Sequence, residues 1–103
     1  MQDEPRDYLP KKELYIQLAE EAAELAQAAV KMYRAITNIN PTDKSMAEAN
    51  ENLIEEYTDV INVAEQLYLD IDFRMMEYKN TRWIKRIKEA LYNDYAGDHQ
   101  QEA

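Results

Sequence analysis

Apolar residues recur every three or four positions in three blocks of the chain, which is the spacing of one face of an α-helix. The first block, residues 11–36, has no glycine or proline and is rich in Ala, Leu, Glu, Gln and Lys, so we predict a helix there. Its apolar face comprises Leu14, Leu18, Leu25, Ala28, Met32 and Ile36.

Residues 37–43 interrupt this pattern with asparagines and Pro41, which favour a turn. We predict a second helix over 43–69, capped by Asp43 or Ser45. Its apolar row is Leu53, Tyr57, Val60, Ala64 and Leu67. A third helix is predicted over 72–93, with Met75, Met76, Tyr78, Trp83, Ile84, Ile87 and Leu91 as its apolar residues.

The two ends of the chain lack this periodicity. Residues 1–10 carry two prolines and are predicted to form an arm that packs through Tyr8 and Leu9. Residues 94–103, which include the only glycine, Gly97, are predicted to be a polar tail. The chain of 103 residues therefore reads as one domain, 1–103.

Three long amphipathic helices predict an all-α antiparallel helical bundle. A chain of this length buries only a modest core. Its eight tyrosines are many for so small a surface, and tyrosine is favoured at interfaces. We therefore expect oligomerisation, as a homodimer or homotetramer, to complete the fold.

Composition excludes several classes of function. A net charge of −9 opposes general binding to nucleic acid, which needs clustered basic residues. The absence of cysteine excludes thiolate metal sites, and the single histidine, His99, excludes sites that need several imidazoles. One glycine cannot build a glycine-rich phosphate loop. With neither a membrane-length apolar run nor an apolar signal segment, we expect a cytoplasmic protein that binds no membrane.

Carboxylates interrupt the apolar rows of the first two predicted helices. A strict continuation of the first row reaches Glu21, and that of the second reaches Glu56. Glu24 and Asp59 each follow three residues later, on the same helix face. Four carboxylates that converge between two helices repel one another, and a hard divalent cation relieves that repulsion. The spacing thus predicts an oxygen-only site for Mg²⁺, with Mn²⁺ as an alternative.

Two other interpretations of these acids stay open. An acidic helical protein can place such pairs on a solvated face, and similar pairs occur at Glu4/Asp7 and Glu48/Glu51. A di-iron carboxylate bundle is a second metal interpretation. It normally requires Glu-x-x-His pairs, and neither predicted helix contains a histidine.

The acidic motifs resemble a known family. Residues 20–31, EEAAELAQAAVK, and 55–60, EEYTDV, resemble the Glu-Glu-x-x-Glu and Glu-x-x-Asp motifs of the MazG-like all-α nucleoside triphosphate pyrophosphohydrolases. The likeness extends to residues 40–42 and 52–54 and to Lys79-x-x-Arg82-Trp83-x-x-Arg86. It covers roughly residues 13–90.

The resemblance implies a fold, a reaction and a set of site residues. Glu21, Glu24, Glu56 and Asp59 would be the Mg²⁺ ligands. Glu20 lies beside them in sequence and can orient or deprotonate the attacking water, with a solvated surface acid as its alternative role. An NTP or dNTP would be cleaved between its α- and β-phosphates to NMP and pyrophosphate, and the expected role is the cleaning of the nucleotide pool. The resemblance favours Lys79, Arg82 and Lys31 as phosphate contacts. Arg86 shares the helical stripe of Lys79 and Arg82, and Asn62 lies three residues after Asp59, where it can hydrogen-bond the sugar or base. Solvent exposure or local pairing is the alternative role of each.

Two functions without catalysis compete with this one. The same fold can hold a nucleotide without cleaving it, as an inactive binding module. An acidic helical oligomer can also serve as a protein-interaction surface, which predicts no response to Mg²⁺.

Overall fold

The computed structural model describes residues 2–102, with side-chain surroundings described up to Asp94. In this part of the chain there are three α-helices, one short 3-10 turn and no strand. The helices are α1 (Lys11–Thr37), α2 (Met46–Gln66) and α3 (Phe73–Glu102), and the turn is Pro5–Asp7. The predicted all-α class is therefore confirmed. None of the three helices is long and apolar enough to cross a membrane.

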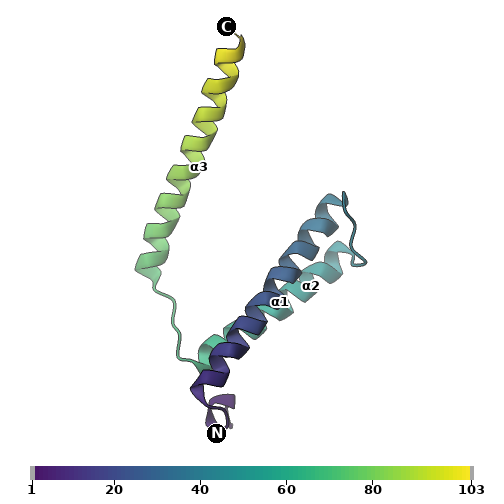
Figure 1. Cartoon of the computed structure of the whole chain (residues 1–103), viewed down its shortest axis with the longest axis vertical. Helices are drawn as coiled ribbons and strands as arrows, with labels where there is room; N and C mark the ends of the chain where they lie inside the picture. Colours follow the sequence, from purple (N-terminus) through teal and green to yellow (C-terminus); the bar gives the residue numbers. More distant parts are fainter. Residues whose placement is uncertain (1, 103) are drawn as a thin grey trace. The chain divides into compact units, whose positions relative to one another are not determined.

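The chain divides into two compact units, Met1–Asp70 and Ile71–Ala103, where the sequence suggested a single domain. The first unit is an antiparallel pair of helices, α1 and α2, joined by a short connection (Figure 1). Its apolar centre is formed by Leu14, Val63 and Leu67, with Leu18 packed against them. Alanines at Ala28 and Ala49 are fully enclosed, and such small side chains let two helices approach closely.

The ends of α2 follow from local chemistry. Ser45 is the N-cap, as one of the two predicted alternatives, and it forms a capping box with Glu48. At the other end Leu69 donates its backbone N–H to Ala64 O, and Tyr68 has a left-handed backbone conformation, with φ 57°. This Schellman-type termination ends the helix at Gln66, three residues before the predicted end.

The N-terminal arm packs onto the end of α2, but through other residues than predicted. Tyr8 is 72% exposed and Leu9 45% exposed. The contact centres instead on the buried Gln66, whose side chain accepts the Arg6 backbone N–H at 3.1 Å and donates to Glu4 at 2.7 Å. The apolar pattern could not predict these polar contacts, because the arm has almost no apolar pattern.

The second unit consists mainly of α3. Asp72 caps it by accepting the Met75 backbone N–H, so the predicted start is close to the observed one. Every described side chain of residues 73–94 is exposed, including the predicted apolar residues. The helix was predicted to end at residue 93, before a polar tail over 94–103. It continues to Glu102 instead, so this prediction is wrong for the backbone of residues 94–102. One glycine costs a helix only about 1 kcal/mol and does not stop it.

Candidate functional site

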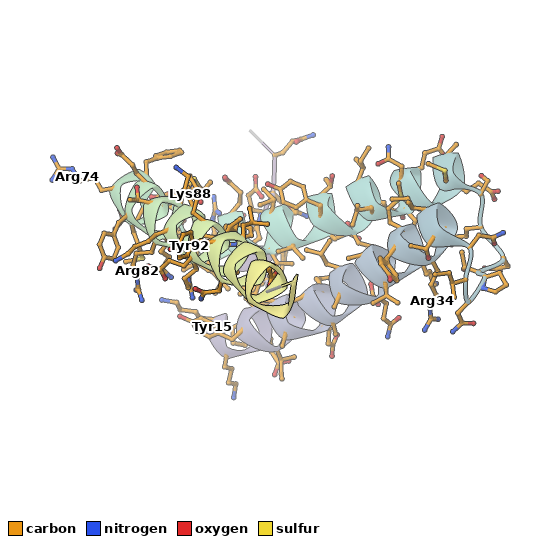
Figure 2. The ribbon with its side chains drawn as sticks, turned by 90° about the horizontal axis from the view of Figure 1, so that it is seen from above. Tyr15, Arg34, Arg74, Arg82, Lys88 and Tyr92 are labelled. Atoms are coloured by element: carbon orange, nitrogen blue, oxygen red, sulfur yellow. The ribbon has the colours of Figure 1, made fainter. Side chains whose placement is uncertain are left out.

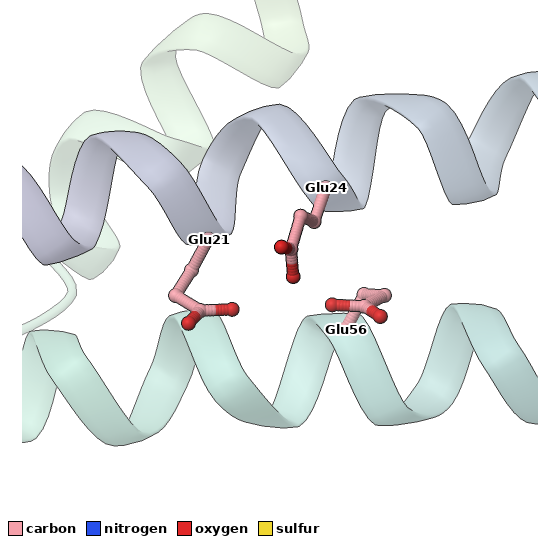
Figure 3. A group of neighbouring side chains, drawn as sticks. All are labelled: Glu21, Glu24 and Glu56. Carbon is pink, nitrogen blue, oxygen red and sulfur yellow. The ribbon is translucent and has the colours of Figure 1, made fainter.

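Three carboxylates meet between α1 and α2. Glu21 and Glu24 come from α1 and Glu56 from α2, and their side chains point toward one another (Figure 3). One oxygen from each lies within 4.8 Å of the others. The predicted interruption of both apolar rows therefore does bring acids from two helices together.

The position of this group follows from the helix pairing. Leu14 packs against Val63 and Leu67, and this contact fixes the register of the two antiparallel helices. Two to three turns further along α1, the same register sets Glu21 and Glu24 level with Glu56. Glu21 and Glu56 are half-buried, whereas Glu24 is exposed, so the group opens to solvent on one side.

Two oxygens of the group are enclosed without a hydrogen-bond partner among the described residues: Glu21 Oε2 and Glu56 Oε2. A carboxylate oxygen removed from water normally finds a donor, because its lost hydration is otherwise uncompensated. The other oxygen of Glu21 does have one, since Gln17 Nε2 donates to Glu21 Oε1 at 2.7 Å. Sequence reasoning missed Gln17, although its position four residues before Glu21 was a usable signal.

The surroundings of Glu56 in the carboxylate group raise its pKa. Enclosure away from water raises the pKa of Glu56 above its ordinary value of 4.5. A hydrogen bond with the Glu24 carboxyl raises this pKa further, as do the negative charges of Glu24, Asp59 and Glu55. The cluster therefore favours a proton, or another positive charge, at this point between the helices.

We expect a pH dependence of stability when divalent cations are removed by a chelator. Because the native pKa of Glu56 is raised, the stabilising contribution of the bound proton is complete below the unfolded value of 4.5 and is lost as pH rises through the native pKa. The free energy of unfolding of the Glu56→Gln variant, relative to the native chain, should therefore increase from pH 4 toward pH 8. Urea titrations across this range measure it, and a pH-independent difference would contradict the raised pKa.

The other predicted residues of the first unit lie on the same two helices. Asp59 is half-buried one turn beyond Glu56 and is not one of the three acids that meet, although its charge acts on Glu56. Glu20 is exposed on α1, next to Glu21. Lys31 is half-buried on α1, and Asn62 is exposed on α2.

The predicted cations of the second unit lie along one side of α3. Lys79, Arg82 and Arg86 flank the same shallow surface as Trp83. All of them are exposed, and the Arg82 guanidinium lies over the Tyr78 ring, 5.7 Å from its centre. Figure 2 shows Arg82 projecting from the helix.

The donor set decides which metal this arrangement can hold. Its oxygens are all carboxylate oxygens, which suit hard divalent cations such as Mg²⁺ and Mn²⁺. The enclosed oxygens without partners fit this assignment, and the open side leaves room for water or phosphate oxygens. No protein-family model, curated protein or solved structure matches the chain.

Proposed function

We propose that this protein is a Mg²⁺-dependent nucleoside triphosphate pyrophosphohydrolase of the MazG-like kind. The observation that carries the proposal is the meeting of Glu21, Glu24 and Glu56, in which two enclosed oxygens have no hydrogen-bond partner among the described residues. Bare carboxylates in such a group repel one another, so a bound divalent ion accounts for the arrangement. The order of the two acidic motifs along the chain supports the choice of reaction.

Each acid has a role in this proposal. Glu21, Glu24 and Glu56 hold the metal, and Asp59 joins them through a change of side-chain rotamer or through an intervening water. Gln17 holds Glu21 in place by its hydrogen bond. When bound, the ion supplies positive charge that neutralises the phosphates and makes a nearby water more acidic.

The proposed reaction is hydrolysis between the α- and β-phosphates. Glu20 orients the attacking water and accepts its proton while the water oxygen bonds to one of the two phosphorus atoms, Pα or Pβ. The bond from that phosphorus to the bridging oxygen breaks, the bridging oxygen leaves with the other phosphate, and NMP and pyrophosphate are released. Lys79 and Arg82 contact the remaining phosphates, with Lys31, Asn62 and Arg86 as further substrate contacts, because an acidic protein otherwise repels a triphosphate.

This proposal requires α3 to complete the bundle. Its apolar residues, with the cations beside them, suit a helix that packs on the α1–α2 pair and turns a basic edge toward bound phosphates. The antiparallel three-helix bundle and its completion by oligomerisation thus belong to the same proposal.

A panel of NTPs and dNTPs, incubated with the full chain and Mg²⁺, tests the function. We expect equal amounts of NMP and pyrophosphate from at least one nucleotide, identified by chromatography. Release of inorganic phosphate instead would place the cleavage at another bond. Binding without any product would favour an inactive nucleotide-binding module, and neither binding nor product would favour a protein-interaction oligomer.

A further inference from the structure

A cleft separate from the carboxylate group lies at the end of the α1–α2 pair where α1 begins and α2 ends. The N-terminal arm crosses this end of the pair (Figure 1). The cleft has a volume of about 340 Å³, and its lining, which belongs entirely to the first unit, includes Arg6, Leu9, Lys11, Leu14, Gln66 and Leu67. Leu14 precedes Glu21 by two turns of α1, so the cleft lies about 10 Å from the carboxylate group along the helix.

The innermost lining of the cleft is apolar. Leu14 and Leu67 line it and are only 3% and 5% exposed, because both belong to the core between the helices. Leu9 adds an apolar side chain from the arm. Such a lining favours a ligand with an apolar body, since binding removes apolar surface of both partners from water.

Gln66 contributes a buried amide to the lining. It is 5% exposed, and its side-chain oxygen accepts the Arg6 backbone N–H at 3.1 Å. This bond fixes the orientation of the amide, because the reversed amide would set two donors against each other. Gln66 Nε2 donates one N–H to Glu4 Oε2 at 2.7 Å, and its second N–H has no acceptor among the described residues. A buried donor without an acceptor is unfavourable, so a ligand that brings an acceptor gains stability here.

The free polar groups around the cleft are mainly donors. Arg6 donates one guanidinium N–H to a backbone carbonyl at the end of α2 and has further N–H groups for a ligand, and the Lys11 ammonium is exposed. α1 also begins here, and its N-cap Pro10 offers no side-chain acceptor to the first N–H groups of the helix. The nearby acids Glu4 and Asp7 each already accept a hydrogen bond within the arm contact. A carboxylate, which only accepts hydrogen bonds, matches this set of donors.

From these observations we propose that the cleft binds a small organic acid. Its carboxylate accepts hydrogen bonds from Gln66, Arg6 and Lys11, and its apolar body lies on the leucines. The volume is near the lower limit for small-molecule sites, which restricts the ligand to a body of about four to eight carbons. Inorganic phosphate would leave the apolar lining uncovered. The binding is independent of the carboxylate group between the helices and of the reaction proposed for it.

Three related compounds test this proposal on the full chain. Isocaproate has both the carboxylate and the apolar body, isocaproamide lacks the charge, and acetate lacks the body. Backbone amide NMR shifts follow each titration at fixed pH and ionic strength, with a chelator present so that no metal ion holds the carboxylate elsewhere. Isocaproate should bind with a dissociation constant of about 1 mM or below and shift the amides of residues 6–14 and 66–68. Isocaproamide should bind at least about 10-fold more weakly, and acetate should give no saturable shift up to about 20 mM.

Two neighbouring lysines provide a matched pair of variants. Lys11 and Lys12 are both exposed in the first turn of α1, but only Lys11 lines the cleft. Lys11→Gln should weaken the binding of isocaproate by about 10-fold, because it removes a charged donor. Lys12→Gln should bind isocaproate like the unmodified chain. Neither lysine is buried, so both variants should fold.

The proposal is overturned if isocaproate shows no saturable binding, or if isocaproamide binds equally well. Equal losses in the two lysine variants would also overturn it, because a general effect of charge would then explain the binding. Shifts centred on Glu21 and Glu56 would place the ligand at the carboxylate group instead and would count against the cleft. None of these results depends on nucleotide hydrolysis.

Discussion

Substitution of Glu56 by glutamine is expected to reduce the hydrolysis of nucleoside triphosphates by at least about 100-fold. Glutamine keeps the shape of the side chain but removes the negative charge, so the proposed metal loses one of the three carboxylates that meet between the helices. Even residues that only support metal ligands typically change affinity or activity by about 10–100-fold, and a direct ligand should have a larger effect. Initial rates of pyrophosphate release at saturating Mg²⁺ measure the loss.

Glu55→Gln is the matched control for this experiment. Glu55 precedes Glu56 on α2, has the same charge and is exposed outside the group of three acids. Its variant should retain nearly the full rate. The Glu56 variant should fold at least as well as the native chain without metal, because it removes a repelling charge. If it keeps the native rate, the assignment of the site is wrong.

The second large effect is on thermal stability. Mg²⁺ should raise the melting temperature of the native chain well beyond the rise that NaCl gives at the same ionic strength. A ligand present at 100 times its dissociation constant stabilises the native state by about 2.7 kcal/mol. In a domain of this length each kcal/mol corresponds to roughly 4–8 °C. We therefore expect a rise of about 10 °C or more at saturation, measured by calorimetry or by circular dichroism.

The same acid variants show whether the stabilisation comes from the carboxylate group. Glu56→Gln should lose most of the rise, whereas Glu55→Gln should keep it, because general screening of a charge of −9 acts on both variants alike. A melting temperature that follows ionic strength alone would remove the support for a metal. It would favour the alternative that this is an acidic interaction protein.

Local patterns predicted much of the first unit. The start of α1 at Lys11 and the cap of α2 at Ser45 were among the predictions, because residues adjacent in sequence determine both. A meeting of acids from both helices was also predicted, as a group of four that included Asp59, since helical periodicity puts Glu21 and Glu56 in the apolar rows. The apolar positions were less well predicted: Ile36 and Tyr57 were assigned to contact rows but are 58% and 55% exposed.

The wrong predictions concern helix ends, which depend on residues distant in sequence or on weak local signals. The helix α2 ends early through its Schellman-type termination at Tyr68. The Tyr68 ring also contacts Arg6, whose guanidinium lies 4.4 Å from the centre of the ring. That contact links residues far apart in sequence. The extension of α3 through Gly97 shows the opposite problem, because a local helix breaker was given too much weight.

The sequence by itself determined that the chain is helical, where its long helices lie, and which two of them carry acids in their apolar rows. These properties depend on a repeat of three to four residues within one helix. Only the tertiary structure decided which three of the predicted acids meet, that Asp59 stays outside this group, and that Gln17 and Gln66 find their partners. The physical reason is that the register of two helices and the rotamers between them are set by packing across the pair, which no single repeat contains.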